Sequence, residues 1–144
     1  MASVFDVSAY ILHKQGSMTA MKLQKLVYYA QAWHLVWDEA PLHRSKTQAW
    51  ANGPVVPSLY ATHRGKFKLT KNEMSKGDLS ALTSAEKTTV DNVLKFYGKK
   101  TGQWLSELTH AENPWKNARS GLEPGQRGDA VITHAAMAEY YGSL

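Results

Sequence analysis

Apolar residues recur at helical spacing between Lys22 and Trp37, and neither Pro nor Gly interrupts this stretch. The period places one group of side chains on a single face of the predicted helix: Leu23, Leu26, Val27, Ala30, His34 and Trp37. Thr19 stands where an N-cap is needed, because its hydroxyl can accept a backbone N–H of the first turn. Since the apolar face is wide and bulky, we expect the rest of the chain to pack around this helix.

The same period predicts helices on both sides of the central stretch. Two long ones, over residues 3–15 and 83–97, begin with capping boxes: Ser3 with Asp6 and Thr83 with Glu86. Shorter helices are expected over residues 58–64, 101–109, 114–119 and 133–142. In the second of these, we expect Trp104, Leu105 and Leu108 to face the core.

A small β element is predicted around the turn signal Asn52-Gly53-Pro54, because Asn and Gly tolerate positive φ and Pro fixes its own φ. Residues 47–50 and 55–56 flank this turn as short extended segments, and Phe67 to Leu69 is a candidate for a further strand within a polar loop. These elements predict a mainly α fold, a single compact domain (residues 1–144) of about five or six helices with a small β element near residues 47–56.

Composition limits the function classes. The chain has no Cys, which excludes disulfides and thiolate chemistry and fits a reducing compartment. The N-terminus lacks a secretion pattern, and no apolar stretch is long enough to span a bilayer, so we expect a cytoplasmic protein without a membrane partner. A net charge of +5 suits an anionic partner, either nucleic acid or an acidic protein face, and equally suits a soluble surface with surplus lysine.

No catalytic or metal-binding pattern is visible in the sequence. The six histidines are scattered, and only His110 with Glu112 has a short spacing that resembles a ligand pair. Phosphate-binding Gly-rich loops and G-x-S-x-G elbows are missing, whereas a Ser–His–Asp set brought together by the fold stays open. From the residues alone we therefore expect a small basic helical domain with no metal and no cofactor, and we see no catalytic site in it.

Three motifs occur in order along the chain: KLQKLVYYAQAWHLVW, AWANGPVVPSLY and THAENPW. Together they strongly resemble the Panacea domain family, the SocA-like antitoxins of bacterial and phage toxin–antitoxin systems. The family pattern falls on Lys22 to Tyr29, Gly53 to Tyr60 and Thr109 to Trp115. The resemblance covers nearly the whole chain and is weakest over residues 66–82.

This resemblance implies a non-enzymatic protein, an antitoxin that neutralises a cognate toxin, typically encoded beside it, by direct protein–protein binding. Two alternatives stay open: an adaptor that delivers the toxin to a cellular protease, and a DNA-binding regulator of its own operon. A phage or prophage origin is consistent with the family. The toxin itself is not named by the sequence.

The candidate partner-binding residues come from the motifs and their neighbours: Lys22, Lys25, Tyr29, Trp33, Trp50, Asn52, Pro54, Tyr60, His110, Glu112 and Trp115. We hypothesise that the Lys22–Lys25–Tyr29 stripe and the corner from Asn52 to Tyr60 form one binding face, because aromatic and basic side chains anchor interfaces. The alternative is that the aromatic residues are core and the motifs are a folding signature. Glu112 either fixes its corner, through His110 or backbone N–H groups near Pro114, or contacts a ligand together with His110.

Overall fold

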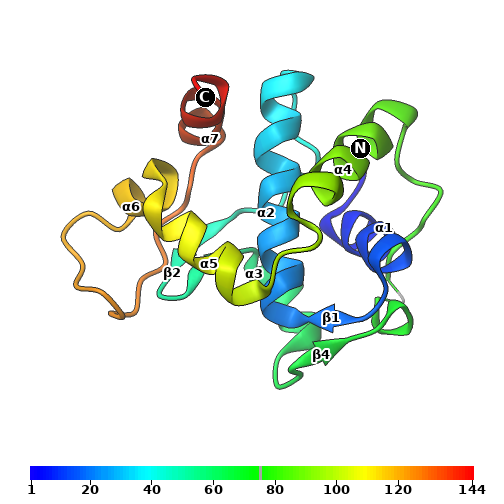
Figure 1. Cartoon of the computed structure of the whole chain (residues 1–144), viewed down its shortest axis with the longest axis horizontal. Coiled ribbons are helices and arrows are strands. Elements are labelled where there is room, and N and C mark those ends of the chain that lie inside the picture. Colours follow the sequence, from blue (N-terminus) through cyan, green and yellow to red (C-terminus); the bar gives the residue numbers. More distant parts are fainter. Residues whose placement is uncertain (75) are drawn as a thin grey trace.

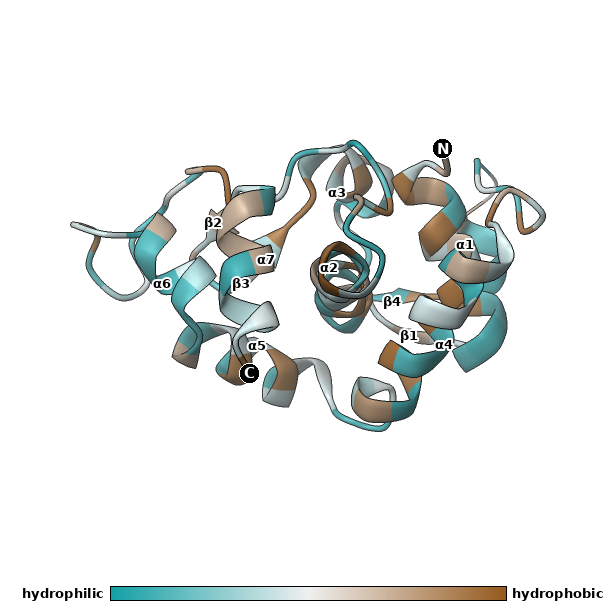
Figure 2. Cartoon of the chain, turned by 90° about the horizontal axis from the view of Figure 1, so that it is seen from above, coloured by the Kyte–Doolittle hydropathy of each residue, from teal (hydrophilic) through white to brown (hydrophobic). Residues whose placement is uncertain are grey.

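A long central helix, α2 (Ala20–Trp37), organises the computed structural model, which describes residues 1–74 and 76–144 (Figure 1). Seen along α2, the other elements surround it on several sides (Figure 2). The remaining α-helices are α1 (Val4–Gln15), α3 (Pro57–His63), α4 (Ser84–Tyr97), α5 (Gly102–Ala111), α6 (Asn113–Ala118) and α7 (His134–Gly142). The fold is mainly α, as the sequence predicts.

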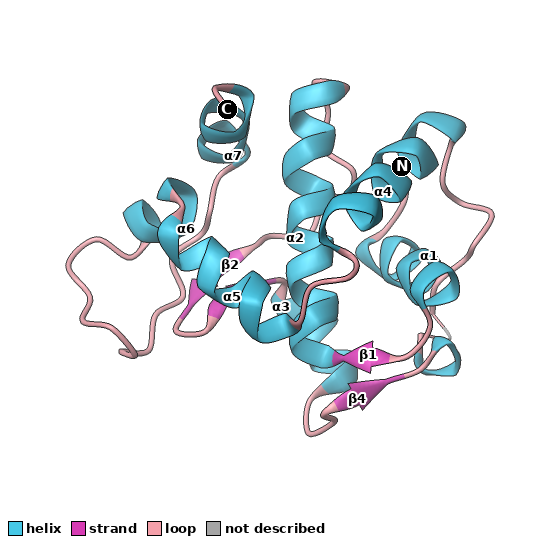
Figure 3. Ribbon diagram, viewed as in Figure 1, coloured by secondary structure: helices cyan, strands magenta, loops and turns pink. Residues whose placement is uncertain are grey.

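Two small antiparallel sheets complete the described part of the chain (Figure 3). In one, β2 (Gln48–Trp50) pairs with β3 (Gly53–Val55), so that Trp50 lies opposite Gly53. This hairpin confirms the β element expected near residues 47–56. In the other, β1 (Met18–Thr19) pairs with β4 (Lys68–Leu69), and a 3-10 turn (Lys71–Glu73) follows. The strand expected at residues 67–69 is confirmed, but its partner lies where the sequence shows no strand pattern.

Helix starts follow the predicted capping. The Ser3–Asp6 and Thr83–Glu86 capping boxes are both formed, and the Thr19 hydroxyl accepts the Lys22 backbone N–H at 3.1 Å. Proline occupies the first turns of α3 and α6, where its missing N–H costs no hydrogen bond. These local signals therefore set most of the helix boundaries.

The central helix is buried on nearly all sides rather than on one face. Leu23, Leu26, Val27 and Ala30 are fully buried, but so is Tyr29 on the neighbouring stripe. Such burial means that other elements cover both stripes, among them α4, α5 and α7. The prediction that α2 has a single inward face is therefore too narrow.

Two tryptophans expected in the core are exposed. Trp37 is 44% exposed at the end of α2, and Trp104 is 42% exposed on α5 with the Lys100 ammonium 4.6 Å from its ring centroid. Leu105, by contrast, is fully buried as predicted.

In the part of the chain that the structure describes, no helix combines the length and the apolar character needed to cross a membrane.

Gly53 is required by both backbone conformation and space, and we expect Gly53→Ala to lower the free energy of unfolding by about 2 to 4 kcal/mol. Its φ is +122°, and an added Cβ would lie 2.5 Å from Lys25 Cε. Gly65→Ala is the matched control, because Gly65 also has a positive φ of +84° but open space around it. The control should lose only about 1 kcal/mol in urea denaturation. Equal losses would show that the approach to Lys25 imposes no constraint.

Candidate functional site

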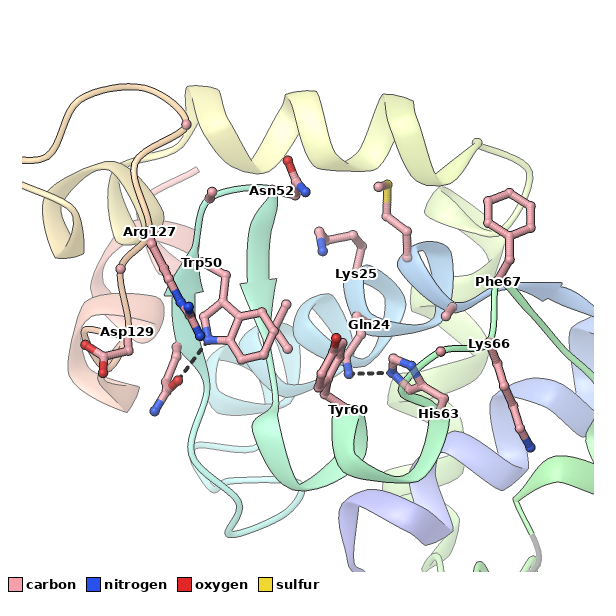
Figure 4. A pocket seen from close by; sticks show the side chains of 18 residues that line it. Gln24, Lys25, Trp50, Asn52, Tyr60, His63, Lys66, Phe67, Arg127 and Asp129 are labelled. Atoms are coloured by element: carbon pink, nitrogen blue, oxygen red, sulfur yellow. Dashed lines mark hydrogen bonds between the residues drawn. The ribbon is translucent and has the colours of Figure 1, made fainter.

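An open cavity of about 1000 Å³ lies between the first turns of α2, the β2–β3 hairpin, α3 and residues 125–129 (Figure 4). We call it the Lys25 cavity. Four of the residues predicted from the sequence line it: Lys25, Trp50, Asn52 and Tyr60. The fold thus brings part of the KLQKL motif and part of the G-P-V corner to one concave surface.

Lys25 is the most unusual residue of this cavity. Its side chain is only 2% exposed, and its ammonium donates to the Pro54 carbonyl at 3.2 Å. The ion pairs within the described residues are His34–Asp38 and Lys66–Glu73, so no carboxylate there neutralises Lys25. Burial lowers the pKa of Lys25 to about 8, because an ammonium is poorly solvated inside the fold.

Gln24, which the sequence reasoning did not single out, clamps the corner beside Lys25. Its side-chain oxygen accepts the Val56 N–H at 2.9 Å, its amide nitrogen approaches the Val56 carbonyl at 3.4 Å, and the same nitrogen lies 3.0 Å from His63 Nε2. Desolvation, and to a smaller extent the nearby Lys25 charge, lowers the pKa of His63. In the sequence, the adjacent polar residues Gln24 and Lys25 within the first motif were the signal that could have pointed to the contacts of both side chains with the corner.

Trp50 and Tyr60 form an aromatic wall of the cavity. Their rings meet edge to face with centroids 4.9 Å apart, and both side chains are half-buried. The Trp50 indole N–H donates to the Gln48 side chain at 2.8 Å, which fixes the ring. Asn52 lies exposed at the tip of the hairpin, where its carbonyl accepts from Ser106.

Lys22 and Tyr29 are directed away from the cavity. The Lys22 ammonium donates to the Gly98 carbonyl at 2.5 Å and so caps the end of α4. Tyr29 is fully buried, with its ring stacked 4.2 Å from that of Tyr97. The hypothesised single face is therefore divided. Lys25 contacts the corner, whereas Lys22 contacts the end of α4 and Tyr29 packs against Tyr97.

Glu112 sits in a buried cluster of tyrosine hydroxyls. One of its oxygens accepts from Tyr29 at 2.6 Å and from Tyr141 at 2.8 Å, and the Tyr28 and Tyr141 hydroxyls lie 3.0 Å apart. The expected partners, His110 or N–H groups near Pro114, are replaced by phenols because α2 and α7 pack against this corner. Burial raises the pKa of Glu112, although both phenol hydrogen bonds act in the opposite direction.

Of the remaining predicted residues, Trp115 and His110 lie beside the β2–β3 hairpin, whereas Trp33 lies farther along α2. Trp115 donates its indole N–H to the Trp50 carbonyl at 2.8 Å, and the His110 ring stacks on it at 4.0 Å. Trp33 is half-buried, and its indole N–H donates to the Tyr97 hydroxyl at 3.0 Å. Within the described residues, no three His, Asp or Glu side chains gather closely enough to hold a metal ion.

The three motifs are thus joined by hydrogen bonds: Lys25 to Pro54, Trp115 to Trp50 and Tyr29 to Glu112. The family model for the antitoxin SocA-like, Panacea domain matches residues 23–116, more than half of the 144-residue chain. The chain belongs to this family. It matches no curated protein and no solved structure. Most residues that line the Lys25 cavity lie within the Panacea match, and Ala20, Met21 and residues 125–129 are added from outside it.

Glu112 should give this Panacea domain a specific pH dependence of stability. Burial raises its pKa above the ordinary value of 4.5, so the unfolded chain releases this proton first as the pH rises. The stabilising contribution of the protonated carboxyl is fully present below pH 4.5 and is lost as the pH rises through the folded-state pKa. Urea denaturation of the parent and of Glu112→Gln over about pH 4 to 8 measures this change.

The glutamine variant keeps an acceptor oxygen for both phenols and does not titrate. The unfolding free energy of Glu112→Gln should therefore increase relative to that of the parent as the pH rises. A difference between the two proteins that does not change with pH would contradict the raised pKa of Glu112. Glu112→Ala removes the acceptor altogether. We expect it to lose about 2 to 4 kcal/mol, because two buried hydroxyls lose their common partner.

Lys25 should lower the stability of the free chain near neutral pH. Its pKa falls from 10.5 to about 8 on folding, so the penalty is complete below that value and fades as the pH approaches 10.5. Lys25→Met keeps the apolar stem without the charge. It should raise the unfolding free energy by about 1 to 3 kcal/mol near neutral pH, with a smaller gain in alkaline solution.

The control for this experiment is Lys95→Met, because Lys95 is an exposed residue of α4 and its replacement should leave stability almost unchanged. If Lys25→Met is less stable than the parent at every pH, the ammonium is needed to hold the Pro54 carbonyl, and the predicted cost of its charge is wrong.

Proposed function

We propose that this Panacea-domain chain neutralises a cognate toxin by direct binding, with the Lys25 cavity as the contact surface. The family assignment supports the antitoxin role. The observation that carries the binding site is the convergence of a buried cation and an aromatic wall on one open cavity. Interfaces draw most of their energy from such anchors in concave, desolvated places.

The aromatic wall is suited to binding because it is already ordered. Trp50 is held by Gln48 on one side and by the Tyr60 ring on the other, and Trp115 holds its backbone carbonyl. A side chain that is fixed before binding loses little rotamer entropy when a partner arrives. The cavity can therefore convert contact area into affinity more efficiently than a flexible surface.

The test is co-expression of the chain with the product of the neighbouring reading frame, followed by pull-down. We expect growth rescue and a stable complex. Trp50→Ala and Tyr60→Ala should each weaken the complex at least about tenfold, since both remove wall area from the cavity. Phe96→Ala is the control, because Phe96 is a 74% exposed aromatic of α4 that does not line the cavity. Thermal unfolding of each variant separates lost binding from lost folding.

Other results would redirect the proposal. Rescue without a complex, accompanied by falling toxin levels, would favour delivery to a protease. Salt-sensitive, sequence-specific duplex binding would favour regulation of the operon, because phosphate contacts weaken steeply with salt. A complex that survives both wall substitutions would place the toxin elsewhere on the domain.

A further inference from the structure

We infer that the Lys25 cavity recognises a carboxylate of the toxin and that the buried ammonium of Lys25 binds it. The carboxylate is carried either by an acidic side chain of the toxin or by the C-terminus of the toxin. This inference rests on the proposed function and names the chemistry of the bound segment. Lys25 acts as the charge receptor, and Trp50 and Tyr60 flank the stem that carries the carboxylate.

The first support is the incomplete bonding of Lys25. An ammonium has three N–H donors, and a single protein acceptor, the Pro54 carbonyl, is found for it among the described residues. The side chain lines the cavity, so the little surface it exposes opens there (Figure 4). A buried cation without a counter-ion is costly, and an incoming carboxylate would remove that cost on binding.

The second support is that the corner does not depend on this charge. Gln24 already binds both polar groups of the Val56 backbone, and Ser106 binds the Asn52 carbonyl. The Pro54 carbonyl alone would be served by a neutral donor. The positive charge of Lys25 is therefore unexplained by the architecture of the hairpin.

The third support is the charge balance around the cavity. Its lining includes three cationic side chains, Lys25, Lys66 and Arg127, against one acidic side chain, Asp129. Lys66 is paired with Glu73 at 2.6 Å, which leaves Lys25 as the cation of the floor and Arg127 as that of the rim. Desolvation lowers the pKa values of the nearby His63 and His110, and the Lys25 charge acts in the same direction.

The recess favours a carboxylate on a flexible stem over a nucleic-acid phosphate. The Lys25 side chain packs closely against the Gly53–Pro54 corner, because a Cβ added at Gly53 would lie only 2.5 Å from Lys25 Cε. A duplex presents its phosphates on a wide convex surface, which meets exposed lysines rather than one that is 2% exposed. Val55 and the aromatic wall line the same cavity as Lys25, and they would pack against the stem of a bound carboxylate.

The first experiment needs no toxin. The Lys25 side-chain resonances of the isotopically labelled chain are followed through a pH titration, alone and with N-acetylphenylalaninate. The carboxylate probe should raise the measured pKa of Lys25 by at least about half a unit, because a nearby anion favours the charged amine. The uncharged N-acetylphenylalaninamide should not. Equal effects of the two probes, or a larger effect of inorganic phosphate, would overturn the carboxylate assignment.

The second experiment uses the toxin complex. Lys25→Met should weaken it at least about tenfold, whereas Lys95→Met should change it less than about twofold. The methionine variant is expected to fold at least as stably as the parent, so a loss of binding would report the missing charge. If it does not fold, the titration of the unmodified chain still decides the question.

The source of the carboxylate is then assigned on the toxin. A short Gly-Ser extension displaces a C-terminal carboxylate, and single Asp→Asn or Glu→Gln changes remove acidic side chains. One of these should abolish the difference between parent and Lys25→Met, and a difference that persists through all of them would overturn the inference. The two proposals also fail separately. Equal toxin binding by parent and Lys25→Met overturns the carboxylate receptor alone, whereas a positive probe titration without any toxin complex overturns the proposed function alone.

Discussion

Because α2 is buried on nearly all sides, each of its polar side chains must find a partner within the protein. An unpaired polar group in the interior costs about as much as several favourable contacts provide. Gln24 pairs with the Val56 backbone, Gln31 with the backbone of Leu42 and His43, and Tyr29 with Glu112. Each of these three residues thus helps to position a segment that lies outside α2.

Lys25 is the exception to this pattern, and it lies in the cavity that we propose as the binding surface. Its neighbours on α2 are satisfied by neutral groups, but its charge meets a single carbonyl. Proteins tend to keep such locally unfavourable features where a ligand will supply the missing interaction. The proposed binding of an anionic group would account for both the charge and the open cavity, whereas burial alone would explain neither.

Folding and binding are not competing explanations of the three motifs. The Trp115 indole N–H donates to the Trp50 carbonyl while the Trp50 ring lines the cavity, so Trp50 links the buried support to the proposed contact surface. Glu112 and Tyr29 lie deeper and fix the junction of α5 and α6 against α2. The motif residues form a graded set, from the buried carboxylate cluster to the half-exposed wall, and only the outer members are available to a partner.

The sequence by itself determined the features that depend on neighbours a few residues apart. Capping residues, helical periods and the Asn52-Gly53 turn act within one turn or hairpin, and the helices and the β2–β3 hairpin could be predicted from them. Tertiary structure decided the rest. Lys22 and Lys25 share a stripe on α2, yet one amine caps α4 and the other meets Pro54, because those acceptors come from segments that the helical period does not describe. The phenol partners of Glu112 and the pairing of β1 with β4 likewise join residues far apart in the chain, whose meeting is set by packing around α2.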